Sequence, residues 1–122
     1  MKILIIDDSE MIRNFHCYIL KTAGFEVITA IDGADALEKI YGSDQDIHLI
    51  VTDINMPNMD GYTFIERLRE DEQYEDLPII IVSTEDELKD MERGYQAGAN
   101  IYIVKPTEPD VLVENIRMLL MT

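Results

Sequence analysis

The chain is poor in the residues that mark several classes of protein. Its 122 residues include no tryptophan and a single cysteine, Cys17, so an internal disulfide and a thiol cluster for a metal are both excluded. Lysine and arginine together number 10, against 25 aspartates and glutamates, which gives a net charge of −15. Such a surface repels nucleic acids and anionic membranes, and we therefore expect neither as a partner.

Long hydrophobic runs are absent as well. The apolar run that follows Lys2 is too short for a signal peptide or a membrane span, and no linker rich in glycine, serine or proline interrupts the chain. Hydrophobic residues make up 47% of the sequence and are spread along its length, as in a globular protein. We expect a cytoplasmic, monomeric protein in which residues 1–122 form a single domain.

Short apolar runs rich in β-branched residues recur along the chain, separated by the length of one strand–helix unit. The expected strands are Ile3–Ile6, Val27–Thr29, Ile47–Thr52, Ile79–Val82 and Ile101–Val104. Apolar residues repeat with helical spacing between these runs, as in Met11, Phe15 and Ile19. The runs do not alternate with polar residues, which is typical of a parallel sheet covered on both faces.

The start and stop signals agree with this alternation. Ser9 is a candidate N-cap for the first helix, Gly24 and Gly98 follow expected helix ends, and Pro109 suits the first turn of the last helix. We predict an α/β fold of five strand–helix units, a flavodoxin-like three-layer sandwich with a parallel sheet in the order 2-1-3-4-5.

Polar side chains stand where the strands should end. Asp7 and Asp8 follow the first run, Asp53 the third, Ser83 the fourth and Lys105 the fifth. Because parallel strands place their carboxyl ends at one edge of the sheet, these side chains should converge on one cleft. Three carboxylates suit a hard divalent cation such as Mg²⁺, whereas a hydroxyl and an ammonium suit a phosphoryl group.

Each of these residues also has a purely structural interpretation. Asp7 and Asp8 could cap the first helix, and Ser83 or its neighbour Thr84 could cap a helix that begins near Asp86. Asp53 is different, because the residues that follow it in DINMPNMDG already supply the turn. Its carboxylate is therefore free to act as a nucleophile toward phosphorus.

The set of motifs resembles the response-regulator receiver domain family, and within it the stand-alone chemotaxis regulators. The paired acids at Asp7 and Asp8, the stretch NMPNMDG, the stretch AGAN and the pair Lys105–Pro106 match that pattern in order and spacing over essentially the whole chain. The resemblance implies a phosphorylation-activated switch of a two-component system, acting in chemotaxis or motility. It would not be an enzyme, apart from self-catalysed phosphoryl acceptance and autodephosphorylation.

The resemblance implies a histidine kinase as the partner that phosphorylates Asp53. It also implies Mg²⁺, or Mn²⁺ in its place, bound by Asp8, Asp53 and the backbone carbonyl of Asn55, with Asp7 acting through water.

It implies further roles for the other site residues. Ser83 and Lys105 would contact the phosphoryl group, and Tyr102 would swing inward when the Ser83 hydroxyl moves; an aromatic residue in a strand can also serve packing alone. Asn55 and Glu85 match the pair that handles the hydrolytic water and tunes dephosphorylation.

The resemblance places the output partner on the face formed by the fourth helix, fifth strand and fifth helix. Two departures leave the identity of that partner open, including whether it is a flagellar motor. Thr107 stands where the chemotaxis regulators usually have phenylalanine, and the fourth helix region is rich in acids: Glu85, Asp86, Glu87, Asp90 and Glu92.

Other functions compete with this interpretation. A receiver in another phosphorelay, or one that regulates another enzyme, fits the same residues. A haloacid-dehalogenase-type phosphatase shares the Asp nucleophile and Mg²⁺, but its second aspartate would fall at Asn55. A flavin mononucleotide carrier would need a phosphate loop where this chain has DDSE, and a pseudo-receiver would not need the intact acid, hydroxyl and lysine set.

Overall fold

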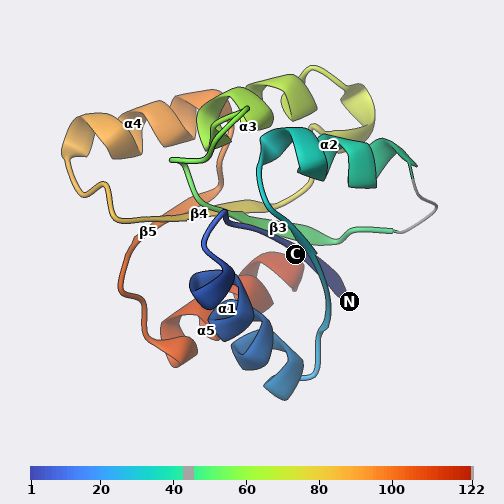
Figure 1. Cartoon of the computed structure of the whole chain (residues 1–122), viewed down its shortest axis with the longest axis vertical. Coiled ribbons are helices and arrows are strands. Elements are labelled where there is room, and N and C mark those ends of the chain that lie inside the picture. The colour runs from blue at the N-terminus through green and yellow to red at the C-terminus, as the bar shows by residue number, and fades with distance from the viewer. Residues whose placement is uncertain (43–45, 122) are drawn as a thin grey trace.

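A five-stranded parallel sheet lies between two layers of helices in the computed structural model, which describes residues 1–42 and 46–121 (Figure 1). The strands follow the order β2-β1-β3-β4-β5, so the predicted fold and strand order are confirmed. The strands are β1 (Lys2–Ile6), β2 (Glu26–Ala30), β3 (Leu49–Thr52), β4 (Ile79–Ser83) and β5 (Ile101–Val104).

The helices divide between the two faces of the sheet. In Figure 1, α2, α3 and α4 cover one face, and α1 and α5 cover the other. The helices are α1 (Glu10–Thr22), α2 (Gly33–Gly42), α3 (Gly61–Arg69), α4 (Leu88–Ala97) and α5 (Pro109–Leu120), and a short 3-10 helix spans Glu72–Tyr74.

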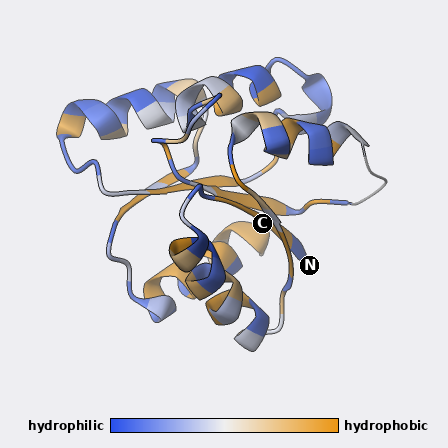
Figure 2. Ribbon diagram, viewed as in Figure 1, coloured by the Kyte–Doolittle hydropathy of each residue, from blue (hydrophilic) through white to orange (hydrophobic). Residues whose placement is uncertain are grey.

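The central strands are hydrophobic because both of their faces are buried. Alternate residues of one strand enter different cores: Leu4 and Ile6 pack toward α2 and α3, whereas Ile3 and Ile5 pack toward α1 and α5. Figure 2 shows the sheet as a hydrophobic layer between helices whose outer surfaces are largely hydrophilic on the α2–α4 side. A run of residues without polar alternation is what this double burial requires.

The helix signals in the sequence have the expected structural roles. The Ser9 hydroxyl caps α1 by accepting a hydrogen bond from the Ile12 N–H at 3.3 Å. Gly24 and Gly98 follow α1 and α4 with φ angles of 97° and 123°, a backbone conformation that glycine adopts without steric cost. Pro109 is the first residue of α5.

Two expected boundaries were wrong by two residues. The third strand begins at Leu49 rather than Ile47, and α4 begins at Leu88 rather than near Asp86. The N-cap of α4 is Glu87, whose side chain makes no capping hydrogen bond. Neither Ser83 nor Thr84 is therefore the cap of this helix.

Candidate functional site

The site lies at the carboxyl ends of four neighbouring strands. Asp7 follows β1, Asp53 follows β3, Ser83 is the last residue of β4 and Lys105 follows β5. These strands are adjacent in the sheet, so residues separated by nearly the whole chain meet at one edge. The candidate residues therefore lie together at the carboxyl edge of the sheet, where the sequence analysis expected them.

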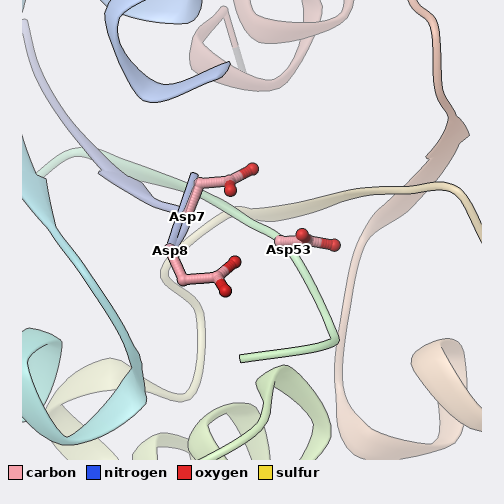
Figure 3. A group of neighbouring side chains, drawn as sticks. All are labelled: Asp7, Asp8 and Asp53. Atoms are coloured by element: carbon pink, nitrogen blue, oxygen red, sulfur yellow. The ribbon is translucent and has the colours of Figure 1, made fainter. Parts of the chain in front are cut away.

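Three carboxylates gather at this edge. Oxygen atoms of Asp7, Asp8 and Asp53 lie within 4.8 Å of one another, and Figure 3 shows the three side chains next to each other at the ends of their strands. Asp7 is buried, Asp53 is partly buried and Asp8 is exposed to solvent. Like charges at this separation repel strongly unless a cation lies near them.

Lys105 supplies positive charge to two of the three. Its Nζ lies 2.9 Å from Asp7 Oδ2 and 3.2 Å from Asp53 Oδ2. Burial alone would lower the pKa of Lys105, but the hydrogen bond to Asp7 and the charge of Asp53 outweigh burial and raise it. The side chain is therefore a fixed cation at neutral pH.

The contact with Lys105 does not fully offset the cost of burying the Asp53 carboxylate. Burial raises the pKa of its carboxyl, and the charge of Lys105 and the Ile54 N–H oppose that shift only in part. The Asp7 carboxylate adds to the increase. Ionised Asp53 is thus held at a cost to stability, as expected for a group that awaits a cation or a reaction partner.

The donor set fits a hard divalent cation. Each aspartate offers carboxylate oxygen, the ligand type that Mg²⁺ prefers, and the exposed position of Asp8 leaves the site open to water. Three carboxylates against the ammonium of Lys105 leave an excess of negative charge. Among the residues of 1–42 and 46–121 no other group of three potential ligands meets the same distance limit.

Asp7 and Asp8 do not cap α1, which was their alternative structural role. Ser9 occupies the cap position, and Asp7 Oδ1 instead accepts a hydrogen bond from the Ser9 N–H at 2.9 Å. Arg13, which sequence reasoning did not identify, donates to the backbone carbonyl of Asp7 at 2.8 Å. Both contacts hold Asp7 at the edge of the sheet with its second oxygen directed to Lys105.

The loop after β3 is folded tightly against Asp53. A Cβ on Gly61 would lie 2.2 Å from the backbone oxygen of Asp53, so only glycine fits there. Asp60 caps α3, accepting from the Thr63 N–H at 2.8 Å. Gly61 was expected only as a turn residue, and the sequence carries no signal for this close approach.

Asp32, which directly precedes α2, also takes part in holding the site. It is buried, accepts from the Asp35 N–H at 2.8 Å and accepts from Asn58 Nδ2 at 2.7 Å. The hydrogen bond from the Asp35 N–H is the main cause that lowers the pKa of Asp32. Asn58 has a φ of 66°, and its bond to Asp32 ties the loop after β3 to the start of α2.

Ser83 is fully buried, and its Oγ accepts from the Glu85 N–H at 3.1 Å. Thr84, the other candidate hydroxyl, is exposed. Asn55 Nδ2 donates to Glu85 Oε1 at 2.9 Å, so the two residues singled out for the hydrolytic water are in direct contact. Their pairing joins the loop after β3 to the loop after β4.

Tyr102 connects this second loop to α4. Its hydroxyl donates to the backbone carbonyl of Glu85 at 2.7 Å, and its N–H donates to the Tyr95 hydroxyl at 3.3 Å. Burial raises the pKa of Tyr102 to about 12. Gly94 leaves room for the ring, since a Cβ there would lie 3.1 Å from Tyr102 Cδ2 and 2.8 Å from Ile81 Cδ1.

The histidines and the cysteine lie outside the acidic cluster. His16 is buried in α1, and burial is the main cause that lowers its pKa. His48 accepts a hydrogen bond from the Lys2 N–H. Cys17 is half-buried, and burial raises the pKa of its thiol.

Comparison with known proteins agrees with this geometry. The family model of the response regulator receiver domain matches residues 3–117. The chain belongs to this family. It is therefore a phosphorylation-activated switch of a two-component system, in a family whose members act as switches rather than as enzymes, and a histidine kinase and an output target are its implied partners.

Several relatives of this receiver domain match over almost their whole length. It is 37% identical to the chemotaxis protein CheY1 of Helicobacter pylori, covering 100% of this chain and 98% of that protein. It is 38% identical to the protein PilG of Pseudomonas aeruginosa, covering 96% and 85% of the two chains.

Solved structures show the same fold. The chemotaxis protein CheY4 of Vibrio cholerae superimposes on this receiver domain with a TM-score of 0.89 and 36% identity, over 98% of each chain. A response regulator from Chloroflexus aurantiacus gives a TM-score of 0.93 with 32% identity, over 99% of this chain and 98% of that one. Across residues 1–42 and 46–121 we find no helix with the length and hydrophobicity needed to cross a membrane.

Proposed function

We propose that Asp53 is the residue that accepts the phosphoryl group. A carboxylate oxygen of Asp53 forms the new bond to phosphorus while the bond from phosphorus to the donor breaks, and the bonding electrons leave with the donor nitrogen of a phosphohistidine. The observation that carries this proposal is the position of Asp53, whose Oδ2 lies 3.2 Å from Lys105 Nζ and whose carboxyl clusters with Asp7 and Asp8.

Asp8 and Asp53 would hold Mg²⁺, with the backbone carbonyl of Asn55 as a further ligand and Asp7 acting through water; Mn²⁺ offers the same preference for oxygen. The bound cation supplies charge neutralisation for the transferring group. The excess of carboxylates at the site supports this assignment.

Lys105 and Ser83 would bind the transferred group. Lys105 is already a cation fixed beside Asp53, and phosphorylation would give it a phosphoryl oxygen as an additional acceptor. Ser83 would lose its hydrogen bond with the Glu85 N–H, and its hydroxyl would donate a hydrogen bond to a phosphoryl oxygen.

Tyr102 would couple phosphorylation of Asp53 to a change at the protein surface. Its hydroxyl is bound to the carbonyl of Glu85, two residues beyond Ser83, so a shift of the β4–α4 loop breaks or moves that contact. The outcome is a rearranged face of α4, β5 and α5, with Tyr102 as the element that has two positions.

Asn55 and Glu85 would set the lifetime of the phosphorylated state. Their side chains meet at 2.9 Å, and Asn55 lies two residues beyond Asp53, which supports a role in orienting a water that attacks the acyl phosphate. The amide and carboxylate would position this water, and hydrolysis would return Asp53 to its free form.

We further propose a monomeric, cytoplasmic receiver whose residues 1–122 form a single domain and which acts in chemotaxis or motility. The full-length similarity to proteins named for chemotaxis supports that process. A receiver in a different phosphorelay, or one that regulates another enzyme, would use the same site with another output partner.

The test is to incubate the protein with acetyl phosphate and Mg²⁺ and to measure its intact mass. Wild type should gain one phosphoryl group, and Asp53→Asn should gain none. Asp76→Asn, which neutralises an exposed aspartate outside the site, is the matched control and should behave as wild type. Uptake by Asp53→Asn, or uptake that persists with a chelator present, would contradict the proposal.

A further inference from the structure

The helix α4 turns hydrophobic side chains to solvent. Leu88 is 71% exposed and Tyr95 is 51% exposed, and Met91, at helical spacing between them, is half-buried. We call these three residues the α4 stripe. The helix packs inward through Gly94 and Ala97 instead, which are buried. The apolar residues whose spacing indicates a helix are therefore not the ones that attach it to the core.

Acidic residues surround the α4 stripe. Asp86, Glu87 and Glu92 are exposed, and Glu92 shares the face of Leu88 because the two are four positions apart. The two cations of the helix offset only part of this charge. Lys89 pairs with Glu87 at 3.2 Å on the open surface, and Arg93 lies over the ring of Tyr62, 4.2 Å from its centroid.

A second apolar surface serves as a comparison. A groove of about 400 Å³ between α1 and α5 is lined in part by Phe15, Tyr18 and Val113. The charged residues of that groove are mixed, since Asp110 and Glu114 stand with Arg117. The excess of acids is therefore smaller at this groove than around the α4 stripe, and a cationic ligand should favour the stripe.

The α4 stripe is joined to the phosphorylation site by hydrogen bonds. The Tyr95 hydroxyl accepts from the Tyr102 N–H at 3.3 Å, and Tyr102 in turn donates to the Glu85 carbonyl at 2.7 Å. The Glu85 N–H donates to Ser83 Oγ at 3.1 Å. A change in the position of Ser83 can thus reach Tyr95, a residue of the stripe, through Glu85 and Tyr102.

We propose that the α4 stripe binds a short basic segment of the output protein, one with large apolar side chains flanked by lysine or arginine. This inference rests on the proposed function and adds the chemistry of the partner. The apolar side chains of that segment cover Leu88 and Tyr95, and its cations face Asp86, Glu87 and Glu92. Phosphorylation of Asp53 changes the affinity by moving Tyr102 against Tyr95.

The first experiment compares labelled peptides by fluorescence anisotropy. The probes are an amphipathic peptide of leucine and lysine, the same peptide with glutamate in place of lysine, and a scrambled leucine–lysine peptide. The leucine–lysine peptide should bind, the glutamate peptide should not, and the scrambled peptide should bind more weakly. Equal binding of the glutamate or the scrambled peptide would overturn the proposal.

Variants then locate the binding surface. Leu88→Ser should weaken binding by ~10-fold, since a central apolar contact is worth about that much. Glu92→Gln should weaken it by ~3-fold and reduce its dependence on salt. Tyr18→Ser, at an exposed residue of α1, and Glu75→Gln, at an exposed acid beyond α3, are the matched controls and should match wild type. Equal losses in the controls would mean non-specific attraction to an acidic protein.

The same samples are analysed by intact mass after treatment with acetyl phosphate and Mg²⁺. Phosphoryl uptake together with a change in peptide affinity supports regulated binding. Uptake without any change in affinity overturns this inference and leaves the proposed function intact. Absence of uptake contradicts the proposed function, whereas the loss in Leu88→Ser still reports on the α4 stripe in the unphosphorylated protein.

Discussion

At the scale of single residues, the site is governed by an excess of negative charge. Lys105 contacts Asp7 and Asp53, and Asp8 adds a third carboxylate to the cluster, so one ammonium stands against three carboxylates. Burial makes the imbalance costly, because it raises the pKa of Asp53 even with Lys105 in contact. Ionised Asp53, which carries the proposed chemistry, is therefore held by the fold at a cost to stability.

The first prediction concerns Asp53→Asn. Since the pKa of Asp53 is raised on folding, ionised Asp53 destabilises the fold at every pH above its ordinary value of 3.8. Removing the charge should increase the free energy of unfolding at pH 7 by ~1 kcal/mol without added cation. Urea denaturation measures it.

The pH dependence provides the control for that prediction. The advantage of Asp53→Asn should shrink as the pH falls toward 3.8, where the unfolded chain also becomes protonated. If Asp53→Asn is less stable than wild type at pH 7, the claim that ionised Asp53 destabilises the fold is contradicted.

The second prediction concerns His16, which is 4% exposed and whose pKa is lowered mainly by burial. A group whose folded pKa is lowered contributes stability above its ordinary pKa of 6.5, and that stability is lost as the pH falls below 6.5 toward the folded pKa. His16→Val should therefore lose less stability than wild type between pH 7.5 and pH 5.5, two values that bracket ~6.5. Equal losses in wild type and His16→Val over this range would contradict the assigned cost of charging His16.

At the scale of elements, the site depends on how closely the loop after β3 approaches its strand. The backbone oxygen of Asp53 leaves no space for a side chain at Gly61, and the Asn58–Asp32 hydrogen bond fixes the loop from its other side. Helix α3 therefore begins, directly after its Asp60 N-cap, at a residue without a Cβ that lies against Asp53.

Gly61→Ala is the third prediction. The added methyl group would sit 2.2 Å from a backbone oxygen, which must move, so we expect a loss of ~2–4 kcal/mol in stability and slower phosphorylation. Gly42→Ala is the matched control, because a Cβ at Gly42, the last residue of α2, meets nothing within 4 Å. Thermal unfolding of both variants measures the difference, and equal effects would contradict the close-approach argument.

The elements also show what the sequence could and could not predict. Strands such as β1 are buried on both faces and therefore appear in the sequence as continuous apolar runs, from which the sheet and its order could be predicted. Because the strands are parallel, the convergence of Asp7, Asp53 and Lys105 at one edge of the sheet could be predicted as well. The outward turn of Leu88 and Tyr95 did not follow, because periodicity shows a helix and not which of its faces is attached. The contact of Asn55 with Glu85 and the close approach of Gly61 depend on loop conformation, which local sequence does not determine.

At the scale of the whole molecule, a net charge of −15 makes the protein sensitive to cations. Most of the acids are spread over the surface, where salt screens them at physiological ionic strength. The cluster of Asp7, Asp8 and Asp53 is partly buried, so a bound divalent ion should act there more strongly than salt does.

The fourth prediction is that Mg²⁺ stabilises the protein by binding the folded state. At ~100 times its dissociation constant, the gain should be about 2.7 kcal/mol, as for any ligand specific to the folded chain. Sodium chloride at equal ionic strength should give a smaller gain. Asp8→Asn should lose most of the Mg²⁺ effect, and Asp76→Asn should keep it; a thermal unfolding series against Mg²⁺ concentration that shows the same shift in both variants would place the ion elsewhere.

The most direct test of the central claim locates the phosphoryl group on the chain. After treatment with acetyl phosphate and Mg²⁺, borohydride reduces an aspartyl phosphate to homoserine, and peptide mass mapping identifies the converted residue. The account predicts conversion at Asp53 alone, dependent on Mg²⁺. Conversion at Asp7 or Asp8 instead, or no conversion in a folded protein that binds Mg²⁺, would contradict it.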